Sequence, residues 1–187
     1  EGETALIHGG ASGVGTAAIQ LCYQAGCKVI ATAGTDAKVA RCLELGATFA
    51  VNYKQQDFAE AVLVHTDGVD VVLDIAGADY LARNMQLLKL RGRLVVIAVL
   101  TGAEAQINLL QMQVKRLRLI GSVLRSRSDE EKNDIIAAFK KRFWPMLVDG
   151  RIQTVIEEVL PIERAADAQA ILGENRNIGK VILQVRP

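Results

Sequence analysis

Short apolar runs alternate with helix-length amphipathic stretches through the first two-thirds of the chain. The apolar runs predict six strands, at residues 4–8, 28–33, 49–53, 69–77, 92–100 and 117–124. The stretches between them predict helices at residues 13–25, 35–45, 57–65, 81–90 and 109–114. Several strands are apolar throughout, which indicates burial on both faces, as in parallel sheets. We therefore predict an α/β fold built on a doubly wound, Rossmann-type parallel sheet of six strands.

The pattern changes after Ser122, where a highly charged run begins. The elements predicted beyond it are a helix at 128–147, a strand at 154–162, a helix at 163–172 and a strand at 180–185. Ser128 and Glu131 have the spacing of a capping box at the start of the long helix. These elements do not continue the earlier alternation. We expect two parts, a nucleotide-binding domain at residues 1–124 and an α+β tail at residues 125–187.

The stretch GASGVG, residues 10–15, lies between the first strand and the first helix. A triphosphate-binding loop would need a lysine after the last glycine, and Thr16 stands there. Short-chain dehydrogenases need a tyrosine followed four residues later by a lysine. Four residues after the three tyrosines stand Cys27, Asp57 and Asn84. Both kinds of site are therefore excluded.

A dinucleotide-binding turn fits this stretch, with Gly10, Ser12 and Gly15 in the three fingerprint positions. Gly10 would make the tight turn, and Gly15 would let the helix pack closely on the strand. Ser12 is small enough to let the backbone approach a pyrophosphate at the helix N-terminus. The alternative is a glycine turn that serves packing alone.

The end of the second strand bears on the choice of dinucleotide. NAD-binding enzymes carry an acid there, which binds the ribose 2′-hydroxyl group. Here Ala33 occupies that place, followed by Gly34 and Thr35. Lys38, one helical turn further on, could neutralise a 2′-phosphate, although it could also be a solvated helix charge. Thr35 or Asp36 can cap the helix, and as a cap the Asp36 side chain would turn to the backbone, so we predict NADPH as the cofactor.

Composition narrows the class of protein. The chain has 187 residues, half of them hydrophobic, and a net charge of +1, so no overall charge favours nucleic acid or acidic membranes. The longest apolar run, at 94–100, is too short to span a bilayer. The three cysteines lack zinc-site spacing and are typical of reduced thiols, so we expect a cytoplasmic protein. The chain does not begin with methionine, and we expect it to be a piece of a longer one.

Several segments taken together are specific: LIHGGASGVGTAAIQL, ATAGTDAK, VNYKQQDF, VLDIAG, LRGRLVVI, SVLRSR and NIGKVIL. Over nearly the whole chain, and in this order, they resemble the quinone oxidoreductase family, the zinc-independent branch of the medium-chain dehydrogenases/reductases. The resemblance implies hydride transfer from NADPH to a quinone or a conjugated carbonyl, without a metal. It also implies that residues 125–187 are the return segment of a GroES-like catalytic domain whose main part this chain lacks. We therefore name no catalytic residue and expect this chain alone to be inactive as a reductase.

The resemblance also implies a set of cofactor contacts. They are Ser12, Gly13 and Val14 at the pyrophosphate; Gly34, Thr35 and Lys38 at the 2′-phosphate; Tyr53 near the adenine; Ala76, Val99 and Leu124 around the ribose and nicotinamide; and Arg176, which would reach back to the cofactor.

The sixth predicted strand would form an edge of the sheet, and an unprotected edge invites pairing with another chain. Leu117, Leu119 and Val123 alternate on one side of it, with Arg118 and Ile120 on the other. We predict a homodimer across residues 117–123, a mode of pairing that the family resemblance also implies. The alternative is an edge covered by the helix of the tail.

A different class of function remains open: a non-catalytic dinucleotide- or RNA-binding module of the same fold. The residues that could form a basic patch are Lys115, Arg116, Arg118, Arg125 and Arg127. They have no aromatic residues between them, which favours solvated or interface charges. We therefore expect a small-molecule substrate and no nucleic-acid partner.

Overall fold

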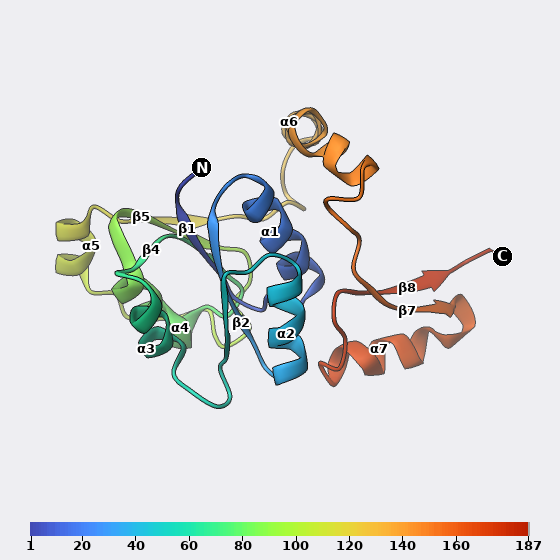
Figure 1. Ribbon diagram of the computed structural model, residues 1–187, viewed down its shortest axis with the longest axis horizontal. Coiled ribbons are helices and arrows are strands. Elements are labelled where there is room, and N and C mark those ends of the chain that lie inside the picture. Colours follow the sequence, from blue (N-terminus) through green and yellow to red (C-terminus); the bar gives the residue numbers. More distant parts are fainter. Residues whose placement is uncertain (187) are drawn as a thin grey trace.

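The computed structural model describes residues 1–186 and shows a parallel sheet with helices on both faces, followed by a separate tail (Figure 1). The strands of the sheet are β1 (Thr4–Ile7), β2 (Lys28–Ala33), β3 (Phe49–Asn52), β4 (Val69–Asp74), β5 (Leu88–Val96) and β6 (Arg118–Gly121). Their order is β3-β2-β1-β4-β5-β6, and all neighbours pair in parallel. The predicted doubly wound sheet is confirmed.

Helices connect successive strands of the sheet. They are α1 (Gly13–Gln24), α2 (Asp36–Glu44), α3 (Phe58–His65), α4 (Ala78–Leu87) and α5 (Leu109–Lys115), with α1 and α2 over one core of the sheet and α3 and α4 over the other. One buried core lies under α1 and α2, where Ile19 and Cys42 meet Val29 and Ala31 of β2. The other lies under α3 and α4 and includes Phe58. The two cores explain why the central strands are apolar on both faces.

The boundary between α4 and β5 differs from the prediction. The sequence predicted a helix at 81–90 and a strand at 92–100, whereas the helix ends at Leu87 and the strand begins at Leu88. Both leucines are almost completely buried, so one apolar pair serves the helix and the strand in turn. Arg91 then adopts a left-handed conformation, with φ 64°, in a stretch where the pairing with β4 shifts register.

The tail consists of α6 (Asp129–Val148), β7 (Ile156–Pro161), a 3-10 turn η1 (Ile162–Arg164), α7 (Ala165–Gly173) and β8 (Lys180–Gln184). β7 and β8 pair in parallel, and α7 packs on them through a small core of Leu160, Ala168 and Ile171. The tail lies beside α1 and α2 (Figure 1). Within residues 1–186, every helix is too short or too polar to cross a lipid bilayer.

Candidate functional site

A cavity of about 500 Å³ lies at the carboxyl ends of β1, β2 and β4. Strand order reverses there, because β2 and β4 lie on opposite sides of β1, and such a crevice is where open α/β sheets bind ligands. The predicted contacts that line the cavity are Ser12, Gly34, Lys38, Tyr53 and Ala76. It is also lined by residues that the sequence did not single out, among them His8, Thr32, Ile75, Tyr80, Leu172 and Asn175.

The glycine turn presents the N-terminus of α1 to this cavity. Ser12 is the N-cap of the helix, and its hydroxyl oxygen accepts a hydrogen bond from the Gly15 amide at 2.9 Å. Within the described chain, the amides of Gly13 and Val14 donate to no protein acceptor. The first turn of α1 holds no acidic residue. Free amides and the positive end of the helix dipole form a binding position for an anion.

The roles of Gly9 and Gly10 in the turn differ from the prediction. Gly9, with φ +63°, takes the left-handed conformation that the sequence assigned to Gly10. At Gly10 a Cβ atom would lie 2.8 Å from the Cys42 Sγ, so that position needs glycine for close packing. At Gly15 a Cβ atom would overlap the carbonyl oxygen of Gly9, which confirms that this glycine brings α1 against the turn.

Gly13 and Val14 line an adjoining groove rather than the main cavity. Its other wall belongs to the tail, with Asn177, Gly179 and Lys180. The Lys180 side chain lies over Gly13, in the space that a Cβ atom there would occupy. A cation is thus placed beside the free amides at the start of α1, and the sequence analysis had not assigned it.

Thr35, rather than Asp36, caps α2, because its hydroxyl oxygen accepts from the Lys38 amide at 3.3 Å. Of the two residues that the sequence allowed as the cap, Thr35 is confirmed, and the other is Asp36. Its carboxylate instead accepts hydrogen bonds from the side chains of Asn52 (2.6 Å) and Gln55 (3.1 Å). These bonds lower the pKa of Asp36, which keeps it ionised and turned toward the loop after β3.

Lys38 is only 6% exposed, and its ammonium group donates to the backbone carbonyl and the side-chain oxygen of Asn175, at 2.6 and 2.8 Å. Burial lowers its pKa, the nearby Lys54 lowers it further, and Glu157 acts in the opposite direction. A Cβ atom at Gly34 would lie 2.7 Å from the Tyr53 hydroxyl oxygen. The absence of a side chain at Gly34 therefore lets the Tyr53 hydroxyl pack against the backbone at the cavity wall.

Ala76 marks the opposite side of the cavity. Asp74, which is fully buried, accepts a hydrogen bond from the Ala76 amide at 2.7 Å and fixes the turn after β4. The chain that leaves β5 crosses this turn, where the Thr101 amide donates to the Ala76 carbonyl at 2.8 Å. Leu100 and Thr101 from this crossing line the cavity.

The remaining predicted contacts lie outside the main cavity. Val99 lines a separate hollow beside the end of β6. The side chain of Leu124 is exposed. Arg176 is an exposed partner of Glu174, and its neighbour Asn175 faces the cavity instead. The structure thus brings together the residues at the ends of β1, β2 and β4 but separates these others from them.

A buried polar cluster forms part of the cavity floor. The His8 ring nitrogens lie 3.0 Å from the Thr32 hydroxyl and 2.7 Å from the Asn84 side-chain oxygen. Burial lowers the pKa of His8, so the imidazole is neutral near pH 7. The signal in the sequence was a histidine directly after an apolar strand. Its partners lie on β2 and α4, too far along the chain for the sequence alone to name them.

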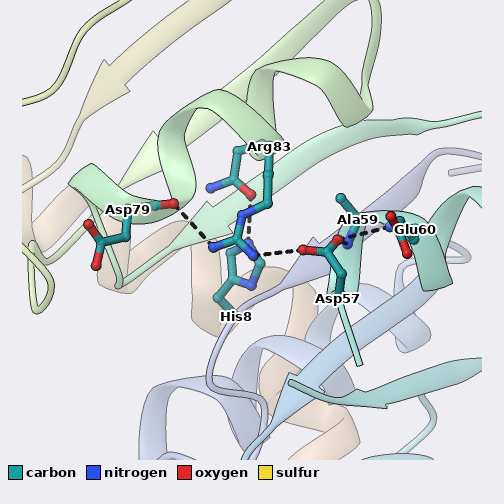
Figure 2. Close-up of polar contacts among 7 residues, drawn as sticks. His8, Asp57, Ala59, Glu60, Asp79 and Arg83 are labelled. Carbon is teal, nitrogen blue, oxygen red and sulfur yellow. Dashed lines mark hydrogen bonds and ion pairs between the residues drawn. The ribbon is translucent and has the colours of Figure 1, made fainter. Parts of the chain in front are cut away.

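Arg83, the residue that precedes Asn84 in α4, lies over this cluster (Figure 2). Its guanidinium group packs over the rings of Phe58 and Tyr80, and it bonds to Asp57 at 2.9 Å. Figure 2 also shows Asp57 accepting from the amides of Ala59 and Glu60 at the start of α3. These contacts tie α4 to α3 beside the cavity.

The residues considered for a basic patch are partly engaged elsewhere. The ammonium group of Lys115 donates to the carbonyls of Gln86 and Leu88, at 2.8 and 2.7 Å. Arg127 pairs with Glu131 at 3.2 Å. Among residues 1–186, no three side chains of histidine, cysteine, aspartate or glutamate gather as a metal site.

Comparison with known proteins places these observations in context. Residues 13–141 match the family described as "Zinc-binding dehydrogenase". The chain is 31% identical over 190 residues to the quinone oxidoreductase-like protein 2 of Bos taurus, across 99% of this chain and 54% of that protein. The chain spans about half the length of the curated relatives it matches.

Solved structures agree in fold. The quinone oxidoreductase of Thermus thermophilus, described alone and in complex with NADPH, superposes with a TM-score of 0.84 at 27% identity, over 98% of this chain and 58% of that one. The Escherichia coli quinone oxidoreductase complexed with NADPH gives a TM-score of 0.82 at 28% identity, over 97% and 56% of the two chains.

Proposed function

Because the chain belongs to the zinc-binding dehydrogenase family, and within it to the zinc-independent quinone oxidoreductases of the medium-chain dehydrogenase/reductase class, we propose that it is the NADPH-binding part of an oxidoreductase. The whole enzyme would transfer a hydride from NADPH to a quinone or a conjugated carbonyl. In this proposal residues 1–124 form the cofactor domain, and residues 125–187 complete a catalytic domain.

One observation carries the proposal: Ser12, the N-cap of α1, and Lys38 line the same cavity, and the free amides of Gly13 and Val14 line the groove that adjoins it. A dinucleotide with a pyrophosphate and a 2′-phosphate has anionic groups for the amides and for Lys38. No carboxylate opposes the 2′-phosphate, since Ala33 ends β2 and Asp36 bonds to Asn52 and Gln55. Gly34 lines the cavity together with Lys38, and the free amides of the first turn of α1 suit a pyrophosphate.

The bound cofactor supplies the hydride chemistry, and the residues of this chain bind and orient it. Ser12 holds the first turn of α1 in place, so that the amides of Gly13 and Val14 face the pyrophosphate. Lys38 contacts the 2′-phosphate, and Tyr53 packs near the adenine. Ala76, fixed by Asp74, forms the wall toward the ribose and nicotinamide. Val99, Leu124 and Arg176 lie outside this cavity, and their contacts with the cofactor stay a prediction.

Titration of NADPH and NADH, followed by nicotinamide fluorescence or by calorimetry, tests the proposal. NADPH should bind at least about tenfold more tightly, since a charged hydrogen bond contributes about 1.5–3 kcal/mol. Lys38→Ala should remove the difference and leave NADH nearly unchanged. Lys28→Ala, an exposed lysine at the far end of β2, is the matched control. Equal dissociation constants for the two cofactors in the unmodified chain would refute the proposed preference.

We also propose that this chain alone is a poor quinone reductase. The orientation of two reactants can contribute about 7–11 kcal/mol to lowering a barrier, and the wall that would orient the quinone belongs to the catalytic domain. Steady-state assays with NADPH and a soluble quinone would measure this. Rapid turnover by the purified chain would show that residues 1–187 contain the whole catalytic site.

A homodimer through β6 is the third part of the proposal. β6 is the last strand of the sheet, and within residues 1–186 nothing lies within 4 Å of where a Cβ atom of Gly121 would stand. Leu117 and Leu119 pack into the core of the sheet, so Ile120 and Val123 remain for the partner. Ile120→Lys should convert a dimeric mass in light scattering to a monomeric one, whereas Val64→Lys on the exposed face of α3 should not. A monomeric mass for the unmodified chain would exclude this dimer.

A further inference from the structure

Asn175 belongs to the tail, yet it lies at the cationic end of the cofactor cavity. It follows the C-terminus of α7 in a left-handed conformation, with φ 51°. Its amide donates to the carbonyl of Leu172 at 3.0 Å, and the next amide, of Arg176, donates to Ile171 at 3.1 Å. These bonds fix the turn and hold Asn175 facing the cavity, while Arg176 is exposed beside Glu174.

Two oxygens of Asn175 accept hydrogen bonds from one ammonium group. The Lys38 Nζ atom lies 2.6 Å from the backbone carbonyl and 2.8 Å from the side-chain oxygen of Asn175. An ammonium group has three donors, so one remains for a ligand. Both residues line the same cavity, in which we propose that the ligand binds.

The charge of Lys38 is held in place but not neutralised. Both of its acceptors are uncharged, and neither is a carboxylate. The other charged groups that act on it are Lys54, from the loop after β3, and Glu157, from β7. Glu157 itself accepts a hydrogen bond from the Ile178 amide at 2.9 Å. The positive charge therefore stays available to an anion at the cavity end.

We infer that Asn175 is the positioning residue of the 2′-phosphate subsite: it holds the Lys38 ammonium where the phosphate binds. A free lysine side chain loses rotamer freedom when it binds a ligand, whereas a held one has already lost it. Affinity for the 2′-phosphate thereby depends on the tail, not on the Rossmann domain alone. The inference rests on the proposed binding of NADPH.

Two substitutions at Asn175 test it, because aspartate and glycine both tolerate the left-handed conformation. The probes are adenosine 2′,5′-bisphosphate and adenosine 5′-monophosphate, compared by calorimetry on the 187-residue chain. Asn175→Asp places a carboxylate on Lys38 and should weaken the bisphosphate about a hundredfold. Asn175→Gly keeps the backbone carbonyl and should weaken binding of the bisphosphate about fivefold. The monophosphate should change less than about twofold in both variants.

Glu174→Gln is the matched control, since this residue is exposed and outside the cavity, and it should change neither affinity. If both Asn175 variants retain the preference for the bisphosphate, the positioning role is overturned while the proposed cofactor stands. The positioning role is also overturned if the two probes weaken equally, because that result indicates a merely structural role. If the unmodified chain shows no preference between the probes, the proposed NADPH specificity and this inference both fall.

Discussion

In the core, β1 is buried at every position and β2 at all but the first, whereas β7 buries only Leu160 and α6 buries no residue. Both regions follow regular sequence patterns and form their elements. The core is stabilised by apolar contact on two faces of a sheet. The tail is joined to the core at a few points, by polar contacts such as Gln20 with Gln153 and Lys38 with Asn175, and by Val155 and Ile178, which pack against the core. A sequence pattern can therefore specify a helix or a strand without showing which other elements pack against it.

The largest expected effect separates the two regions by stability. Leu94→Ala should lower the free energy of unfolding by about 3 kcal/mol, because it opens a cavity in the fully buried centre of β5. Val159→Ala in β7 should cost less than about 0.5 kcal/mol, since that side chain is half-exposed. Urea unfolding followed by circular dichroism measures both. Similar losses in the two variants would contradict the difference between core and tail.

Two glycines sharpen the comparison. Gly15→Ala should destabilise the core by about 2 kcal/mol and abolish cofactor binding, because the new Cβ atom would press on the backbone of Gly9 and Gly10. Gly173→Ala, at the end of α7, meets nothing within 4 Å and should be neutral or stabilise by up to about 1 kcal/mol. Thermal unfolding with and without NADPH separates stability from binding. A destabilising Gly173→Ala would show that the tail is more tightly packed than its exposure indicates.

A smaller effect should appear where the tail joins the core. The buried Gln20 side chain donates to the Gln153 carbonyl at 3.0 Å and accepts from its amide at 2.8 Å. Gln20→Met leaves both backbone groups without that partner, at a cost of about 1 kcal/mol. Hydrogen exchange should become faster in residues 150–186 and stay unchanged in β1 and β4. Uniform acceleration in both regions would mean that the tail and core unfold as one unit.

The last expected effect concerns pH and arises at the buried His8. Burial lowers the pKa of His8 in the folded state below its unfolded value of about 6.5. The unfolded chain then binds more protons, so stability falls as the pH drops below about 6.5, by at most about 1.4 kcal/mol per pH unit. His8→Gln should reduce this slope between pH 7.5 and 5.5. An unchanged slope would assign the pH dependence to other groups.

The sequence predicted the sheet, because continuous apolar runs and glycine-ended helices reflect local physics. It also placed Ser12, Gly34 and Lys38 at one cavity, since the carboxyl ends of parallel strands meet at the same edge. It failed at Leu87 and Leu88, where one apolar pair suits both a helix and a strand.

The tail shows a different limit. Arg176 was taken from the family resemblance, and its contact with the cofactor stays a prediction, whereas a left-handed turn at Asn175 decides which of the two neighbours faces the cavity. The contacts of His8 with Thr32 and Asn84 could not be predicted either, because they join elements that are distant in the chain. Such pairings depend on the packed structure and leave no local signal.

The contact between Gly179 and the glycine turn has a consequence for synthesis. The Gly179 amide donates to the Ala11 carbonyl at 2.8 Å, so a wall of the cofactor site joins nearly the first and nearly the last residues of the chain. Closing so long a loop is slow compared with the local contacts of the sheet. A ribosome-bound nascent chain can fold its first strands and helices while the cofactor site stays incomplete. A complete wall for the proposed cofactor would then form only after Gly179 has been synthesised, as a late step separate from the folding of the sheet.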